Sequence, residues 1–224
     1  MLSERMLTTA VRSCATRFMN IKPCTEPRIP GPNAGQRYML YAHIPFCERL
    51  CPYCSFNRFP FSEKRAVPYF KNLRAELMMV KELGYDFDSL YIGGGTPTIM
   101  IDELCETIDL ARDLFHVKEV NSETNPNHLI PEYLDKLHGR IQRLSVGVQS
   151  FDDEVLRILG RAHDAEAARA AVRAAQERFE NVSVDLMCGI PGQSAESFAE
   201  SVREAVALGA NHVSVYLSLI HISE

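Results

Sequence analysis

Two kinds of hydrophobic segment alternate along the chain after Arg37. One kind is a short apolar run, as expected for a strand buried in a parallel sheet. The other kind has apolar residues at intervals of three and four, which is typical of an amphipathic helix. The predicted strands are residues 37–44, 89–95, 119–124, 143–150, 181–190 and 212–220.

Helical spacing fills the intervals between these strands. It is found at residues 70–80 and 101–115, near 131–138, in segments up to about 178, and at 198–209. Alternating strands and helices imply parallel strands joined by crossover helices. We predict an α/β fold of six strands, as an open doubly wound sheet or an incomplete barrel. Both place functional residues at the carboxyl ends of the strands.

The segment before the first strand has a different character. Residues 23–36 are rich in proline and glycine and are interpreted as a linker, preceded by a short helical arm in residues 1–22. We therefore predict an N-terminal arm and linker (1–36) and a core domain (37–224).

Composition and charge change this picture little. The 224 residues are 46% hydrophobic and 24% charged, with a formal net charge of -5, so nothing indicates a nucleic-acid partner or a membrane surface. No apolar run is long enough to span a bilayer. Charged residues interrupt the N-terminal segment, unlike a signal peptide, although its mildly basic character would also suit a transit peptide. We expect a cytoplasmic protein with reduced cysteines.

Three of the seven cysteines, Cys47, Cys51 and Cys54, lie within eight residues. One loop with this spacing can wrap three thiolates around a compact centre. Iron–sulfur clusters usually take four cysteine ligands, so three would leave one iron with an open position. A zinc site would need a fourth nitrogen or sulfur donor, and unligated thiols are a further alternative. The spacing favours a cluster.

Other polar and glycine residues follow the predicted strands. The glycines at 93–95 would let a ligand approach the backbone, or would simply form a tight turn. Glu123 can accept hydrogen bonds from ribose hydroxyls or an ammonium group, or can be a solvated charge. Asp185 lies within an apolar strand, where an idle carboxylate would be costly.

The stretch "HIPFCERLCPYCSF" resembles the signature of the radical S-adenosylmethionine (SAM) superfamily. Together with "YIGGGTPT", "LSVGVQSF" and "DLMCGIPGQ", it is similar to the oxygen-independent coproporphyrinogen III oxidase family, which includes heme chaperones. The resemblance runs from about Tyr38 to Tyr216. It implies an incomplete (β/α)6 radical-SAM barrel in which Cys47, Cys51 and Cys54 hold a [4Fe–4S] cluster. It also implies that SAM chelates the fourth iron and is cleaved reductively to a 5′-deoxyadenosyl radical.

The resemblance also implies a set of cofactor-binding residues: Tyr41, Tyr53, Gly94, Gly95, Thr96, Glu123, Gln149, Arg161 and Asp185. Within this set Tyr53 would lie by the adenine, and the glycine loop would contact the methionine part. The last three match positions that contact a second SAM in the oxidase branch. A packed strand aromatic at Tyr41 and a surface arginine at Arg161 are the alternatives.

The implied partners are a tetrapyrrole or heme and an electron donor such as flavodoxin or ferredoxin. In two respects the sequence departs from the oxidases. The oxidase branch has a cysteine two residues after the third, whereas this chain has Ser55 and Phe56, like the heme-chaperone branch. Family members also continue beyond the sixth strand, so we expect a C-terminally truncated core. The resemblance therefore predicts a SAM-cleaving protein of tetrapyrrole chemistry or, alternatively, a heme chaperone without oxidase activity.

Overall fold

The computed structural model describes residues 13–14 and 29–217. It divides the chain into two units, Met1–Gly31 and Pro32–Glu224, and the description below concerns the second. The predicted helical arm, apart from residues 13–14, and residues 218–220 of the last predicted strand lie outside the described residues. The predicted domain boundary after residue 36 stays a prediction.

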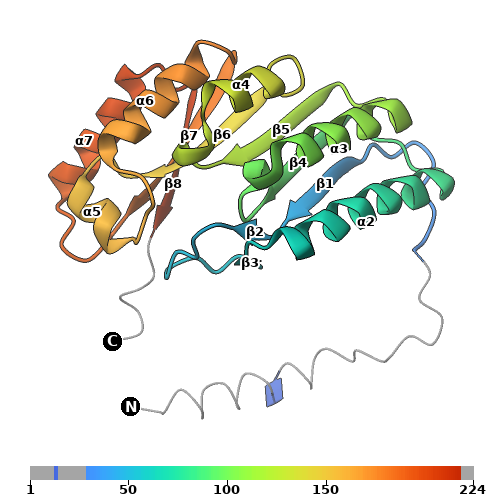
Figure 1. Ribbon diagram of the computed structural model, residues 1–224, viewed down its shortest axis with the longest axis horizontal. Helices are drawn as coiled ribbons and strands as arrows, with labels where there is room; N and C mark the ends of the chain where they lie inside the picture. The colour runs from blue at the N-terminus through green and yellow to red at the C-terminus, as the bar shows by residue number, and fades with distance from the viewer. Residues whose placement is uncertain (1–12, 15–28, 218–224) are drawn as a thin grey trace. The chain divides into compact units, whose positions relative to one another are not determined.

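All six predicted strands are present and form one parallel sheet (Figure 1). They are β1 (Met39–Ile44), β4 (Ser89–Gly94), β5 (Glu119–Thr124), β6 (Arg143–Gln149), β7 (Asn181–Cys188) and β8 (His212–Leu217). The spatial order, β1-β4-β5-β6-β7-β8, is the order along the chain. A doubly wound sheet reverses its strand order at a switch point, and this sheet does not. The structure is therefore the incomplete-barrel alternative.

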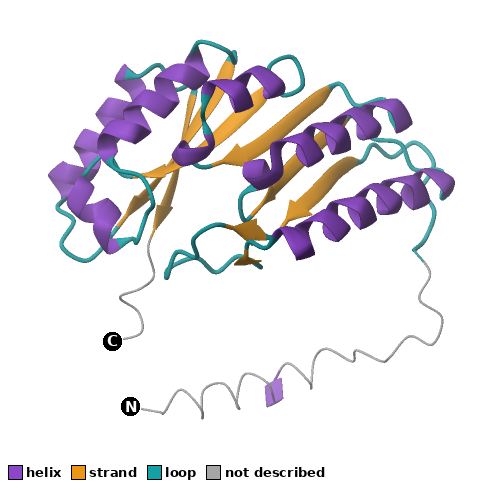
Figure 2. Ribbon diagram, viewed as in Figure 1, coloured by secondary structure: helices purple, strands orange, loops and turns teal. Residues whose placement is uncertain are grey.

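The helices lie in the crossovers between the strands. They are α2 (Glu63–Glu82), α3 (Ile101–Leu114), α4 (Pro131–Leu137), α5 (Asp153–Ile158), α6 (Ala165–Gln176) and α7 (Ala195–Ala207), with short 3₁₀ turns η1 (Pro97–Met100) and η2 (Pro126–His128). Right-handed crossovers between successive neighbouring strands bring every helix to the same face of a sheet. Figure 2 shows the helices along the outer side of the curved sheet.

Alternation along each strand separates the two faces of this sheet. Leu90 and Ile92 on β4 and Leu144 on β6 are almost completely buried in the core between the sheet and the helices. Successive side chains of a strand point to opposite faces, so the intervening Tyr91 and Ser145 lie on the other face. That inner face carries polar side chains, and the candidate site is built on it.

A second, two-stranded parallel sheet was not predicted. It pairs β2 (Phe46–Cys47) with β3 (Phe59–Pro60). Backbone hydrogen bonds from Phe59 N to Pro45 O (2.6 Å) and from Phe61 N to Cys47 O (2.8 Å) hold it together. Two-residue strands are too short to show a hydrophobic period, so the sequence pattern carries no signal for them. This small sheet closes the ends of the segment that contains the three clustered cysteines.

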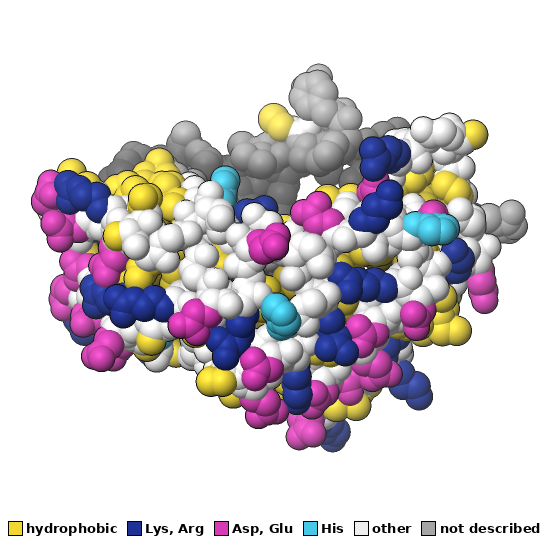
Figure 3. Space-filling model, turned by 90° about the horizontal axis from the view of Figure 1, so that it is seen from above, with side chains coloured by type: hydrophobic (Ala, Val, Ile, Leu, Met, Phe, Trp, Pro, Cys, Tyr) yellow, Lys and Arg dark blue, Asp and Glu magenta, His cyan; other side chains and the backbone are white. Residues whose placement is uncertain are grey.

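On the face seen in Figure 3, acidic and basic side chains are interspersed. Among the described helices, none combines the length and the apolar character needed to cross a membrane.

Candidate functional site

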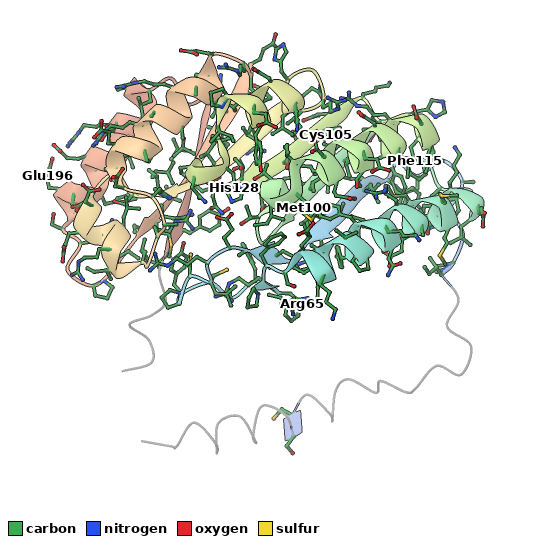
Figure 4. The ribbon with its side chains drawn as sticks, in the orientation of Figure 1. Arg65, Met100, Cys105, Phe115, His128 and Glu196 are labelled. Carbon is green, nitrogen blue, oxygen red and sulfur yellow. The ribbon has the colours of Figure 1, made fainter. Side chains whose placement is uncertain are left out.

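The cysteine loop, residues 47–54, begins at the end of β2. Cys47 is buried, Cys51 and Cys54 are partly exposed, and all three are free thiols. A turn joins the last two, since Cys54 N donates to Cys51 O at 3.2 Å. Burial raises the pKa of Cys47, and the neighbouring Cys54 and Cys51 raise it further. Cys105 is also buried, but it lies on α3 and not in the cysteine loop (Figure 4).

Cys51 and Cys54 both act electrostatically on Cys47. Among the described residues, however, no group of three or more His, Cys, Asp and Glu side chains has the arrangement of a formed metal site. The predicted cluster therefore stays a prediction at this point.

The glycine turn at the end of β4 packs directly on the strand that leads into the cysteine loop. Gly94 has φ +123°, and a Cβ there would lie 2.8 Å from both His43 Cε1 and Ile44 O. A Cβ on Gly95 would lie 2.7 Å from Phe46 O and 2.8 Å from Cys47 Sγ. Only glycine permits these approaches. The turn thus brings the end of β4 against Cys47.

Glu123, at the end of β5, is held by two donors. Tyr91 Oη donates to its Oε1 at 2.7 Å, and Gly94 N donates to its Oε2 at 3.1 Å. Burial, followed by the hydrogen bond to Glu123, raises the pKa of Tyr91. The ring of Tyr41 stacks on Tyr91 with centroids 6.0 Å apart, and Tyr41 Oη lies 2.9 Å from His43 Nδ1. These groups form one polar cluster beside the glycine turn.

Asp185, on the inner face of β7, is the other carboxylate of this face that the sequence singled out. Ser145 Oγ donates to both of its oxygens at 3.1 Å. Burial raises the pKa of Asp185 to about 6, against smaller opposing effects of hydrogen bonds from Ser214 and Ser145. The negative charge of Glu123 also raises it. A partly protonated carboxyl near neutral pH can either donate or accept a hydrogen bond.

Gln149 ends β6 in an unusual conformation. Its φ is +72°, and the pairing of β6 with β7 shifts register just before it. A non-glycine residue in this left-handed region is uncommon and often marks a functional position. Its Nε2 lies 3.0 Å from where a Cβ on Gly147 would be, so the amide covers that glycine on the inner face.

Arg161, between α5 and α6, reaches into the site. Its Nη1 lies 3.4 Å from Cys51 Sγ and 3.4 Å from Tyr53 Oη. Its Nη2 donates to Asn125 Oδ1 at 2.7 Å and to Gly147 O at 2.5 Å. The side chain is half-buried and faces the cysteine loop. These contacts differ from those of a solvated arginine at a helix end.

A small hollow opens beside Arg161, and part of its lining was not singled out from the sequence. Cys51, Thr96, Asn125, His128 and Arg161 contribute to its wall. Asn125 Nδ2 donates to Thr96 Oγ1 at 2.8 Å, and His128 is buried (Figure 4). Asn125 follows β5 directly, so its place at the end of a strand was the available signal. His128 had no such signal.

The residues present fit an iron–sulfur cluster in three respects. A single loop supplies three thiols, which are the ligands such clusters take. The cationic Arg161 lies beside one of them, where it would offset the negative charge of thiolates. Gly95 leaves free the space next to Cys47 Sγ that any side chain would fill.

Comparison with known proteins gives this site its context. Residues 41–205 match the model of the family described as the Radical SAM superfamily. The chain belongs to this superfamily. The matched segment includes the cysteine loop, the glycine turn, Glu123, Arg161 and Asp185.

Two curated proteins are similar in sequence. The heme chaperone HemW of Bacillus subtilis is 36% identical over 189 residues, which cover 80% of this chain and 50% of that protein. The oxygen-independent coproporphyrinogen III oxidase of Paracoccus denitrificans is 35% identical over 193 residues, covering 82% of this chain and 43% of that protein. The chain spans about half the length of the curated relatives it matches.

A solved structure of the superfamily has the same fold. The coproporphyrinogen III oxidase HemN from Escherichia coli, described as a radical SAM enzyme, matches with a TM-score of 0.73 at 32% identity. The match covers 82% of this chain and 44% of that chain. The predicted superfamily and fold class are therefore confirmed.

Proposed function

We propose that the chain holds a [4Fe–4S] cluster through Cys47, Cys51 and Cys54, and binds SAM beside it. The observation that carries the proposal is the packing of the three-cysteine loop against the glycine turn of β4, in a member of the radical SAM superfamily. When bound, the cluster supplies the electron for reductive cleavage of SAM. The expected electron donor is a flavodoxin or a ferredoxin.

The inner face of the sheet offers the groups that SAM needs. Glu123 is a carboxylate that can accept hydrogen bonds from an ammonium group or from ribose hydroxyls, and its orientation is set by Tyr91 and Gly94. Tyr53 is available to stack on an adenine. The remaining proposed contacts are Tyr41, Gly94, Gly95, Thr96, Gln149, Arg161 and Asp185.

Iron content tests the cluster. After anaerobic reconstitution we expect about four irons and four sulfides per chain, as in a cubane cluster with cysteine ligands. Cys47→Ala, Cys51→Ala and Cys54→Ala should each abolish iron binding. Cys105→Ala is the matched control, because Cys105 is buried on α3 away from the loop. Stoichiometric zinc, with no iron-linked absorbance, would contradict the proposal.

Calorimetry of the reconstituted protein tests the SAM site. Glu123→Gln keeps the shape of the side chain but removes its charge, so SAM should bind about tenfold or more weakly while iron content is unchanged. Glu119→Gln is the control, because Glu119 lies on the same strand but is exposed. Equal SAM affinities of wild type and Glu123→Gln would show that the carboxylate has no part in binding.

A second candidate function is heme binding and transfer without oxidase activity. The observation that favours it is Phe56, which is 59% exposed and stands where the resemblance places a cysteine in the oxidases. Phenylalanine supplies neither a ligand nor a redox group. We expect the Soret absorbance of heme to shift when heme binds to the chain. We also expect no conversion of coproporphyrinogen III in an anaerobic assay with reductant and SAM. Protoporphyrinogen IX in that assay would refute the chaperone alternative.

A further inference from the structure

Arg161 connects two parts of the chain that are far apart in sequence. On one side its Nη1 contacts Cys51 Sγ and Tyr53 Oη, both at 3.4 Å, across sequence separations of 110 and 108 residues. On the other side its Nη2 donates to Gly147 O on β6 and to Asn125 Oδ1 after β5. The planar guanidinium, with its fixed fork of donors, is suited to such a bridge.

The backbone of the same residue is also tied to the loop. Arg49 Nη1 donates to Arg161 O at 3.3 Å, and Arg161 N donates to Leu156 O on α5 at 3.0 Å. The position of the guanidinium is therefore set by α5 and by the sheet, and the cysteine loop rests against it.

We propose that Arg161 is a positioning residue for the cysteine loop, which it clamps to the end of β6 while placing a positive charge beside Cys51. This inference rests on the proposed function, in which Cys51 is a cluster ligand. The reduction potential of an iron–sulfur cluster depends on nearby charge and on hydrogen bonds to its sulfurs. A cation at this position favours the reduced, more negative cluster, so it raises the potential.

This positioning role is additional to the SAM contact proposed above for Arg161. Both Nη atoms already bind protein groups, whereas Nε is buried and has no partner within the described part of the chain. A residue that acts only on SAM would leave the loop and the cluster unchanged when SAM is absent. The two roles are therefore separated by measurements made without SAM.

The first measurement is hydrogen–deuterium exchange of the full apo chain over residues 49–57. Arg161→Gln should speed exchange of the loop amides about tenfold or more, because the loop loses its contact with β6. Arg157→Gln is the control, since Arg157 is exposed on α5 and pairs with Glu154. Arg161→Lys should also exchange faster than wild type, because one ammonium cannot reproduce the fork.

The second measurement is the midpoint potential of the reconstituted cluster without SAM. It should fall in Arg161→Gln and stay near the wild-type value in Arg161→Lys, which keeps the charge, and in Arg157→Gln. The inference is overturned if Arg161→Gln has both the loop exchange rates and the midpoint potential of wild type. If Arg161→Gln does not fold, Arg161→Lys decides, because wild-type loop protection in that variant contradicts the clamp. A wild-type chain that takes up no iron would refute the proposed function, while the exchange data would still decide the clamp.

Discussion

Gly94→Ala is the substitution whose cost the structure defines most closely. Gly94 has φ +123°, a conformation that costs an L-residue about 1–3 kcal/mol. The added methyl group would also lie 2.8 Å from His43 Cε1 and from Ile44 O, and one of these contacts is to backbone. Overpacking of this kind costs a further 1–3 kcal/mol, roughly. We therefore expect the free energy of unfolding to fall by about 2–6 kcal/mol.

Urea unfolding of the apo chain, followed by circular dichroism, measures this loss. Gly139→Ala is the matched control, because Gly139 has φ +78° but no atom within 4 Å of its added Cβ. That variant should lose only about 1–2 kcal/mol of stability, which is the strain of placing an L-residue in the left-handed backbone conformation. The reasoning is refuted if Gly94→Ala costs no more than Gly139→Ala, since the close packing of β4 on β1 would then have no energetic weight.

Three further substitutions test the sheet and the cap of α5, each by urea unfolding. Asp185→Asn should become more stable relative to wild type as the pH rises from 4 to 7, by up to about 3 kcal/mol. Burial raises the folded-state pKa of Asp185 to about 6, so the wild-type carboxyl stabilises the fold at low pH and loses this effect as the pH rises. A pH-independent difference between the two proteins would contradict this. Asp152→Ala should cost about 1–2 kcal/mol at pH 7, because Asp152 caps α5 by accepting from Glu154 N and Val155 N. That cost should shrink as the pH falls below 4, since the hydrogen bond from Ser197 lowers the pKa of Asp152; an undiminished cost at pH 3 would count against it. Leu144→Ala, at a fully buried position of β6, should cost about 2–5 kcal/mol, and a loss under 1 kcal/mol would contradict its place in the core.

The strands were predictable because their apolar runs are local features of the sequence. Leu144 and Val146, for example, lie in a run bounded by polar residues, and burial of that run follows directly. The choice between a doubly wound sheet and an incomplete barrel was not predictable from periodicity, because both have the same local pattern. Strand order depends on how the crossovers return to the sheet, and hydrophobic spacing does not encode it.

Candidate site residues could be proposed from the sequence where they belong to a motif or end a strand. Cys47, Glu123 and Asp185 were singled out in this way, and their roles stay predictions. Tyr91 and His128 were missed, because the first looks like any strand aromatic and the second follows a short turn. The contact between Arg161 and Cys51 joins residues 110 positions apart. Only the path of the chain around the sheet brings such residues together, so local patterns cannot predict the pair.

The strand order also has a consequence for the way the chain folds. Among the described pairings of the main sheet, β5 with β6 closes the shortest segment of chain, and β1 with β4 closes the longest. The long segment exists because the cysteine loop and α2 are inserted there. Closing it costs roughly 0.7 kcal/mol more entropy than closing the shortest one. Folding is therefore expected to begin at β5 and β6 and to add β1 late, so that the cysteine loop gains its native surroundings only when the rest of the sheet is in place.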